Sequence, residues 1–161
     1  MLLLALLLAA AAPQKPWLEM QAGPMFLRDA GRSALTHGPL VRLGLGYSLG
    51  DRAAAELWLS GVMQSAPQGV SGDRALVSGG AGGRVMLFAF DEGKLGLWAR
   101  GGIGWALPVA GDAQGGPTGF AGALLSFQPF VKRFSLALEV DGLAYRNSLG
   151  LALLPSLRCS F

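Results

Sequence analysis

The chain alternates between apolar residues and small or polar residues with a period of two over most of its length. In the stretch VRLGLGYSLG, residues 41–50, Val41 and Leu43 fall on one side of a strand and Arg42 falls on the other. Successive side chains of a β-strand point to opposite faces, so this period predicts strands. The pattern predicts eight of them, covering residues 17–27, 40–49, 53–63, 80–90, 95–107, 119–128, 134–145 and 149–161.

The links between these strands are expected to alternate in length. Long links rich in Gly, Ser, Pro and Asp join the strands across residues 27–40, 63–80 and 107–119, whereas GDR, DEGK and PFVKR read as tight turns. The last link on the long side, at residues 146–148, is short and departs from the rule. Long loops at one end and short turns at the other predict an antiparallel up-and-down arrangement.

The two faces of the predicted strands differ in chemistry. One face is apolar throughout, with residues such as Leu18, Leu43 and Leu138. The other holds glycines, serines and every charge placed within a strand: Glu19, Arg42, Glu56, Arg84, Arg100, Glu139, Asp141 and Arg158. An arginine facing lipid at mid-depth costs about 2 to 4 kcal/mol, and a soluble barrel would need a more polar outside. We therefore predict an all-β fold: an eight-stranded antiparallel transmembrane barrel, closed because open edges cannot exist in hydrocarbon.

Composition agrees with this fold class. Hydrophobic residues make up 52% of the 161 residues and charged residues 14%, against roughly 25% charged in soluble domains. No apolar run reaches the roughly 18 residues of a spanning helix. The net charge of +3 lies outside the strands and at both ends of the predicted barrel, so we expect no nucleic-acid partner.

The first residues, MLLLALLLAAAAPQ, form a short apolar run that ends in alanines. This pattern is typical of an export signal and is too short for a helical anchor. We expect a signal peptide at residues 1–12, cleaved near Ala11 or Ala12, followed by a barrel domain at residues 13–161. The alternative is a helix that packs in a core.

The interior is expected to hold a salt-bridge network. Its four carboxylates and four arginines balance in charge, and buried charges require partners. An eight-stranded barrel has room only for side chains, so an open pore is not expected. Small residues would make room for Trp98 and the guanidinium groups; they are Gly44, Gly46, Gly96, Gly102 and Gly104.

Aromatic residues on the apolar face gather near the predicted strand ends. This placement is typical of the interfacial girdles of membrane barrels, although aromatic residues also favour strands in general. The short-turn end carries Tyr47, Phe127, Phe134 and Phe161, and the loop end carries Phe26 and Trp105.

With these features, the chain resembles the small eight-stranded outer-membrane barrels of Gram-negative bacteria, of the OmpA/OmpX type. Its end, LLPSLRCSF, is similar to the terminal signature that the outer-membrane assembly machinery reads, with Leu153, Leu157 and Phe161 as the signal. Cys159 stands where the family usually has a larger apolar residue. The resemblance implies an outer-membrane location and contacts with membrane lipid, lipopolysaccharide and envelope proteins.

Two prolines lie in strands that must pair with each other to close the barrel. Pro24 is in the first predicted strand and Pro155 is in the last. Because proline has no N–H to donate, we predict a bulge or a weak seam where these strands meet.

Candidate chemistry is sparse, and we expect no cofactor, no metal site and no enzyme activity. The predicted role is structural or interactive, through outward loops, with a barrel subunit of an envelope or surface-motility complex as one version. One alternative is a lipid A deacylase or acyltransferase that uses His37 with Ser33 or Ser148. A second is a narrow channel that depends on Arg84 or Arg100.

Three further motifs have competing interpretations. Glu139 and Asp141 share a face and could act as general acid and base, but ion pairing is the preferred interpretation. The segment GGAGGR lacks the Lys and Ser or Thr of a phosphate loop. Charges near the loop end could contact lipopolysaccharide phosphates or could simply be solvated: Arg28, Arg32, Arg74 and Arg146, with Asp29, Asp73 and Asp112.

Overall fold

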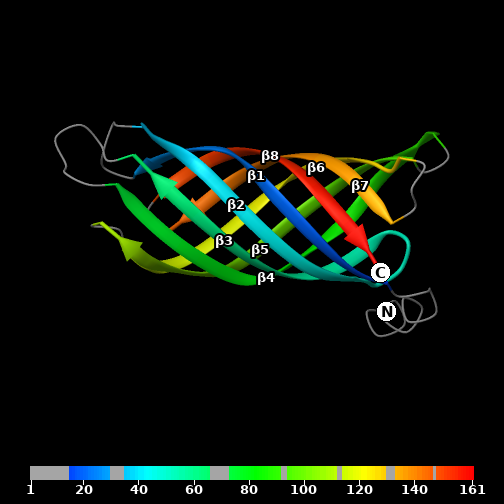
Figure 1. Ribbon diagram of the computed structural model, residues 1–161, viewed down its shortest axis with the longest axis horizontal. Coiled ribbons are helices and arrows are strands. Elements are labelled where there is room, and N and C mark those ends of the chain that lie inside the picture. The colour runs from blue at the N-terminus through cyan, green and yellow to red at the C-terminus, as the bar shows by residue number, and fades with distance from the viewer. Residues whose placement is uncertain are drawn as a thin grey trace.

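The structure is a computed structural model that describes residues 15–29, 35–65, 73–91, 94–111, 114–129, 133–146 and 148–161. Eight antiparallel strands form one closed barrel in chain order, and the last strand pairs with the first (Figure 1). This confirms the predicted fold class. The strands are β1 (Pro16–Asp29), β2 (Leu35–Ser48), β3 (Ala53–Gln64), β4 (Arg74–Phe90), β5 (Leu95–Ala110), β6 (Gly116–Phe127), β7 (Phe134–Tyr145) and β8 (Ser148–Ser160).

Several strands extend further toward the loop end than the pattern predicts. β4 begins at Arg74 rather than Gly80, and β2 begins at Leu35 rather than Leu40. The extensions are held by pairing, because Gln64 lies opposite Arg74 and Arg28 lies opposite Leu35. Glycine-rich and serine-rich segments look like loops in the sequence, but a neighbouring strand can hold them in the ladder.

These extensions shorten the links that the sequence marked as long. Residues 30–34, 65–73, 111–115 and 146–147 join strands at one end, and residues 49–52, 91–94 and 128–133 join them at the other. Only the link at 65–73 is longer than every turn at the opposite end, so the expectation of three long loops is wrong. The start of β1 and the end of β8 lie at the short-turn end, where Trp17 pairs with Ser160 (Figure 1).

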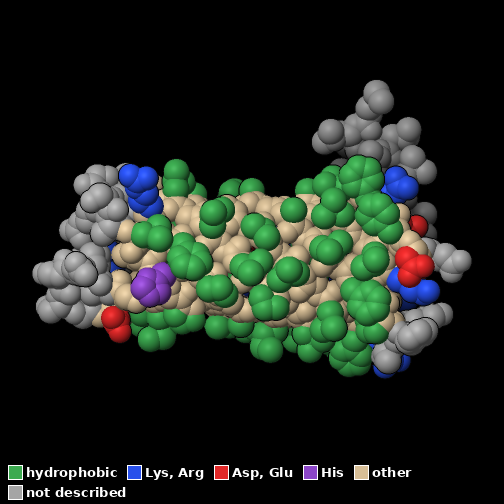
Figure 2. Space-filling model, turned by 90° about the horizontal axis from the view of Figure 1, so that it is seen from above, with side chains coloured by type: hydrophobic (Ala, Val, Ile, Leu, Met, Phe, Trp, Pro, Cys, Tyr) green, Lys and Arg blue, Asp and Glu red, His purple; other side chains and the backbone are tan. Residues whose placement is uncertain are grey.

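The outer wall is apolar, as predicted. The large apolar side chains at outward positions are solvent-exposed in the isolated chain, including Leu18, Leu43 and Leu138. Figure 2 shows hydrophobic side chains along the visible wall and charged side chains at its two ends. The described residues contain no helix that is long and apolar enough to cross a membrane. The predicted signal segment, residues 1–12, lies outside the described residues.

A β-bulge changes the alternation near the end of β4. The register shifts between Met86 and Phe88, so that Phe88 and Phe90 both lie on the exposed surface together with Leu87. Strict alternation would have placed the two phenylalanines inside. Their rings stack with centroids 6.2 Å apart, and they extend the aromatic girdle at the short-turn end beyond the four predicted residues, Tyr47, Phe127, Phe134 and Phe161.

The contact between β1 and β8 has an interrupted ladder but no bulge. Gln21 pairs with Ser156 and Met25 pairs with Ala152 in one unbroken register, while the residues between them make no pairing. The bulge that the prolines suggested is therefore absent, and a gap in the ladder takes its place.

The gap lies where backbone atoms approach closely. A Cβ at Gly23 would collide with the carbonyl oxygen of Leu153, so only glycine fits there. On its other side β1 pairs with β2, where Pro24 lies directly opposite Pro39. Neither proline has an N–H to donate, so one potential ladder donor is missing from β1 and one from β2 at this level.

Candidate functional site in the barrel lumen

Seven charged side chains and one glutamine gather inside the barrel, toward its short-turn end. Strand alternation points these eight side chains inward, and each residue is at most 4% exposed. Six strands contribute: Glu19 and Gln21 from β1, Arg42 from β2, Glu56 from β3, Arg84 from β4, Arg100 from β5, and Glu139 and Asp141 from β7.

Arg100 lies at the centre of this group. Its Nε is 2.6 Å from Oε1 of Glu56, and its Nη1 is 2.6 Å from Oε2 of Glu139. Hydrogen bonds between charged groups at such distances are among the strongest in proteins. Arg100 therefore joins carboxylates from two strands that do not neighbour each other, β3 and β7.

Arg84 extends the group toward β1. Its Nη2 lies 2.7 Å from Oε2 of Glu19 and 3.3 Å from Oε2 of Glu56. The Ser156 hydroxyl donates to the other oxygen of Glu19 at 3.0 Å. The Arg84 guanidinium also stacks over Trp17, 3.8 Å from a ring centroid, and this position provides a cation–π contact.

Arg42 completes the group on the opposite side. Its Nη1 is 2.7 Å from Oδ2 of Asp141 and 3.4 Å from Oε1 of Glu139. It also donates to Oε1 of Gln21 at 3.3 Å, and the Gln21 amide donates to Glu139. The Arg42 guanidinium lies 3.8 Å from the ring centroid of Phe120.

Together these contacts form one continuous chain in which negative and positive groups alternate. The order is Glu19, Arg84, Glu56, Arg100, Glu139, Arg42 and Asp141. We call these seven residues the ion chain. Each arginine contacts two carboxylates, which is how buried charges avoid standing unpaired. Since Glu139 and Asp141 both bind Arg42, neither is a free acid or base.

Arg158 is the predicted member that the ion chain leaves out. Its Nε donates a hydrogen bond to the Ser135 hydroxyl at 2.9 Å, and its guanidinium carbon lies 5.9 Å from the ring centroid of Trp17. It pairs across the ladder with Glu19, but Arg84 and Ser156 already occupy that carboxylate. The sequence predicted that four arginines would pair with four carboxylates. In the structure three arginines pair with the four carboxylates, and Arg158 lies nearby, half-buried.

Glycines make the space that the large interior side chains occupy. A Cβ at Gly46 would overlap the ring of Trp17, and one at Gly102 would lie 2.7 Å from Nε1 of Trp58. At Gly96 a Cβ would lie 2.8 Å from Nε1 of Trp98. The glycines thus make room for large side chains, as predicted. They make room for Trp17 and Trp58 as well as for Trp98.

The loop-end half of the lumen is mostly apolar, although Ser60, Ser78 and Gln64 are also buried there. The sequence pattern predicted charges, glycines and serines on the inward face and did not predict this apolar half. The sequence signal for this apolar half is a segment with apolar residues on both faces of a strand, such as GVM at residues 61–63. Twelve buried residues form this apolar cluster: Met25, Leu27, Leu40, Trp58, Val62, Leu76, Ala106, Phe120, Leu143, Tyr145, Ala152 and Leu154.

The residues of the enzyme alternative are not brought together by the described structure. His37 lies at an exposed outward position opposite Phe26, whereas Ser148 lies on the inward side of β8. Ser33 falls outside the described residues. Within the described ranges, no three His, Cys, Asp or Glu side chains converge as ligands for a metal ion.

The predicted assembly residues lie at the end of β8. Leu153 and Leu157 point outward and are exposed, as is Phe161. The backbone N–H of Phe161 donates to the carbonyl of Pro16 at 3.0 Å, so the last residue is tied to the start of β1.

Comparisons with known proteins match the fold but not the sequence. No family model matches the chain, and no curated protein does. Neisserial surface protein A (NspA) aligns with a TM-score of 0.71 at 14% identity, over 91% of this chain and 97% of that one. Ail, the attachment invasion locus protein of Yersinia pestis, aligns at 0.61 with 12% identity, over 91% and 98%. The outer membrane protein OprG of Pseudomonas aeruginosa aligns at 0.60 with 8% identity, over 93% and 98%.

At 8 to 14% identity these similarities concern the fold alone. The apolar wall and the charged interior are consistent with that fold. A closed barrel with this distribution of side chains suits hydrocarbon outside and polar contacts within. The protein has the fold of the small eight-stranded outer-membrane β-barrels, with the architecture of the OmpA/OmpX type.

Removing the central arginine should destabilise the barrel strongly. Arg100→Met removes the shorter ion pair of both Glu56 and Glu139 and leaves each with one longer arginine contact, to Arg84 at 3.3 Å and to Arg42 at 3.4 Å. Breaking a buried ion pair by removing one partner costs about 3 to 5 kcal/mol. We expect that loss in the free energy of unfolding, measured by urea denaturation in lipid vesicles. Arg158→Met is the matched control and should lose only about 1.5 kcal/mol. Equal losses in both variants would contradict the ion chain.

Filling the space above Trp17 should also be costly. Gly46→Ala places a methyl group inside the Trp17 ring, and overpacking of this kind costs about 1 to 3 kcal/mol. Gly61→Ala is the control, because no atom lies within 4 Å of its added Cβ, and it should change stability by less than about 0.5 kcal/mol. The same vesicle denaturation measures both, and a neutral Gly46→Ala would show that Trp17 can move aside freely.

Proposed function

We propose that the protein is a closed, non-conducting and non-enzymatic barrel that acts through its outer surfaces, chiefly through its loop end. The observation that carries this proposal is the filling of the lumen. The ion chain occupies its short-turn half, and the apolar cluster occupies its loop-end half. Ligand chemistry is therefore assigned to the outside of the barrel.

The ends of the barrel suggest its orientation. Outer-membrane barrels place their short turns in the periplasm and their longer loops outside the cell. The link at residues 65–73, which is longer than every turn at the opposite end, supports an orientation with the loop end toward the exterior. The turns at residues 49–52 and 91–94 then face envelope components, and Phe161, at the end of β8, lies at the same end of the barrel.

The channel alternative requires ions to cross the apolar cluster. Buried apolar side chains such as Leu40, Val62 and Leu154 are at most 1% exposed, and such packing leaves no continuous water. The ion chain alone could guide ions, but it ends where the cluster begins. This arrangement supports a closed barrel.

A bilayer experiment tests this part of the proposal. The purified barrel, reconstituted in a planar bilayer in 1 M KCl (about 3 Å Debye length), should give no discrete conductance steps, while an open porin in the same bilayer gives them. Arg84→Ala should not create steps, because the apolar cluster remains intact. Steps in the wild type whose size changes in Arg84→Ala would establish the narrow channel instead.

The loop end carries cationic side chains that suit an anionic surface ligand. Arg28 and Arg146 are exposed there, and Arg74 begins β4 at the same end. Ail was also solved in complex with the heparin analogue sucrose octasulfate. That observation concerns Ail, and a fold likeness at 14% identity transfers no ligand. The arginines of this chain motivate the test, and a protein partner in an envelope complex is the alternative occupant.

Binding of heparin to the folded barrel tests the loop-end role. We expect binding that weakens as salt rises and that falls about fivefold in Arg146→Ala and in Arg74→Ala, about 1 kcal/mol each. Arg52→Ala, which removes an exposed arginine at the short-turn end, is the control and should bind like the wild type. An equal loss in Arg52→Ala, or no binding at all, would remove the anionic-ligand version of the proposal.

A further inference from the structure

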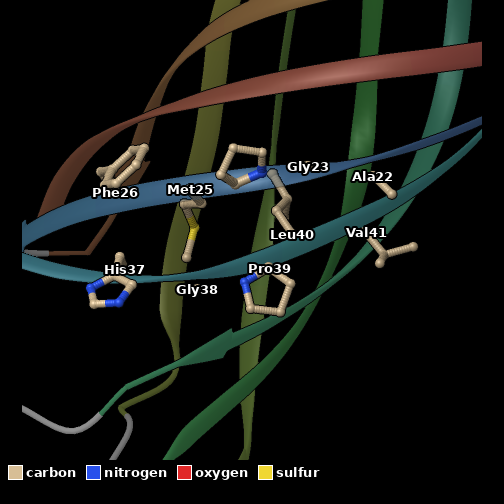
Figure 3. A pocket seen from close by; sticks show the side chains of 10 residues that line it. Ala22, Gly23, Met25, Phe26, His37, Gly38, Pro39, Leu40 and Val41 are labelled. Carbon is tan, nitrogen blue, oxygen red and sulfur yellow. The ribbon is translucent and has the colours of Figure 1, made fainter.

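The lipid-facing wall carries a groove between β1 and β2. It has a volume of about 570 Å³, within the range of about 300 to 1,000 Å³ that small-molecule sites occupy. Its lining includes Ala22, Pro24 and Phe26 from β1 and His37, Pro39 and Val41 from β2 (Figure 3). The groove is open to the surroundings of the barrel and is not connected to the ion chain.

The groove follows from the residues at its floor. Pro24 and Pro39 lie opposite each other at outward positions, and their compact rings stand between longer exposed side chains such as Met20 and Phe26. Because these two rings are short, the wall is low at one place between two strands that remain paired.

The groove has an apolar floor and a cationic end. His37 lies opposite Phe26 in the register, and the next outward pair toward the loops is Arg28 with Leu35. Figure 3 shows Phe26 and His37 at the same end of the groove, on neighbouring strands. Arg28 is exposed and continues the outward row of β1 beyond Phe26. The apolar part thus lies in the membrane, and the polar groups lie where the membrane ends.

We propose that this groove holds an acyl chain of a phosphorylated glycolipid of the outer leaflet, lipid A, with a phosphate bound by Arg28 and His37. An acyl chain suits the lining because the groove opens into hydrocarbon. A phosphate suits the loop-side end of the groove because the guanidinium of Arg28 and the imidazole of His37 have N–H groups that can donate to phosphate oxygens. The inference rests on the proposed orientation, in which the loop end lies in the outer leaflet that this glycolipid forms, and it does not depend on a ligand for the loops.

Native mass spectrometry of the folded barrel in detergent tests the site. The probes are lipid A and the same lipid with its phosphates removed, so that only the headgroup charge differs. We expect one lipid A per barrel, bound at least about tenfold more tightly than the dephosphorylated lipid. Arg28→Ala should abolish that difference, and Ala22→Trp, which fills the groove, should weaken binding of both lipids.

Matched variants distinguish the groove from general lipid contact. Arg52→Ala removes an exposed arginine at the opposite end, and Ala121→Trp adds a ring to the outward face of β6; both should bind like the wild type. Equal binding of the two lipids to the wild type would overturn the proposal, as would unchanged binding in Ala22→Trp. Each variant is first checked for folding by its gel mobility without boiling. The comparison of lipid A with dephosphorylated lipid A on the wild-type barrel tests the proposal even if a variant fails to fold.

Discussion

The alternating chain of carboxylates and guanidinium groups is the interaction on which the rest of this barrel depends. A charge inside a narrow barrel has lost most of its water, so it must find a partner on another strand. Seven groups meet this demand in a single line from Glu19 to Asp141. The remaining strands supply neutral support, with Phe120 of β6 stacked on Arg42 and Ser156 of β8 bonded to Glu19. All eight strands are thus tied together inside the barrel as well as along its ladders.

This line occupies only half of the lumen, and the division has functional meaning. Toward the loops the interior becomes an apolar core, with Trp58 and Phe120 at the boundary, their rings 5.5 Å apart and nearly perpendicular. Such a core resists water as the interior of a soluble domain does. A barrel filled by an ionic half and a mostly apolar half agrees with the closed barrel proposed above. Its interactions are then expected at its ends and on its wall.

The wall itself is uneven where β1 meets its neighbours. Glycines allow close approach of the backbones at Gly23 and Gly38, and prolines remove ladder donors at Pro24 and Pro39. The ladder to β8 is interrupted at the same level of β1. These features combine at one place, which produces a groove on an otherwise continuous apolar surface.

The sequence by itself determined the strands, their two faces and the location of the charges. Period-two alternation is a local property, and the bilayer requires that no charge interrupt the outer face, so both can be read from residues such as Val41 and Arg42. The tertiary structure alone decided which charges meet. Arg100 joins Glu56 to Glu139 because of how the strands are staggered around the barrel. The exclusion of Arg158, the bulge near Leu87, the apolar half of the lumen and the groove at Pro24 and Pro39 arise in the same way. Each depends on register between segments distant in sequence, and no local pattern encodes that register.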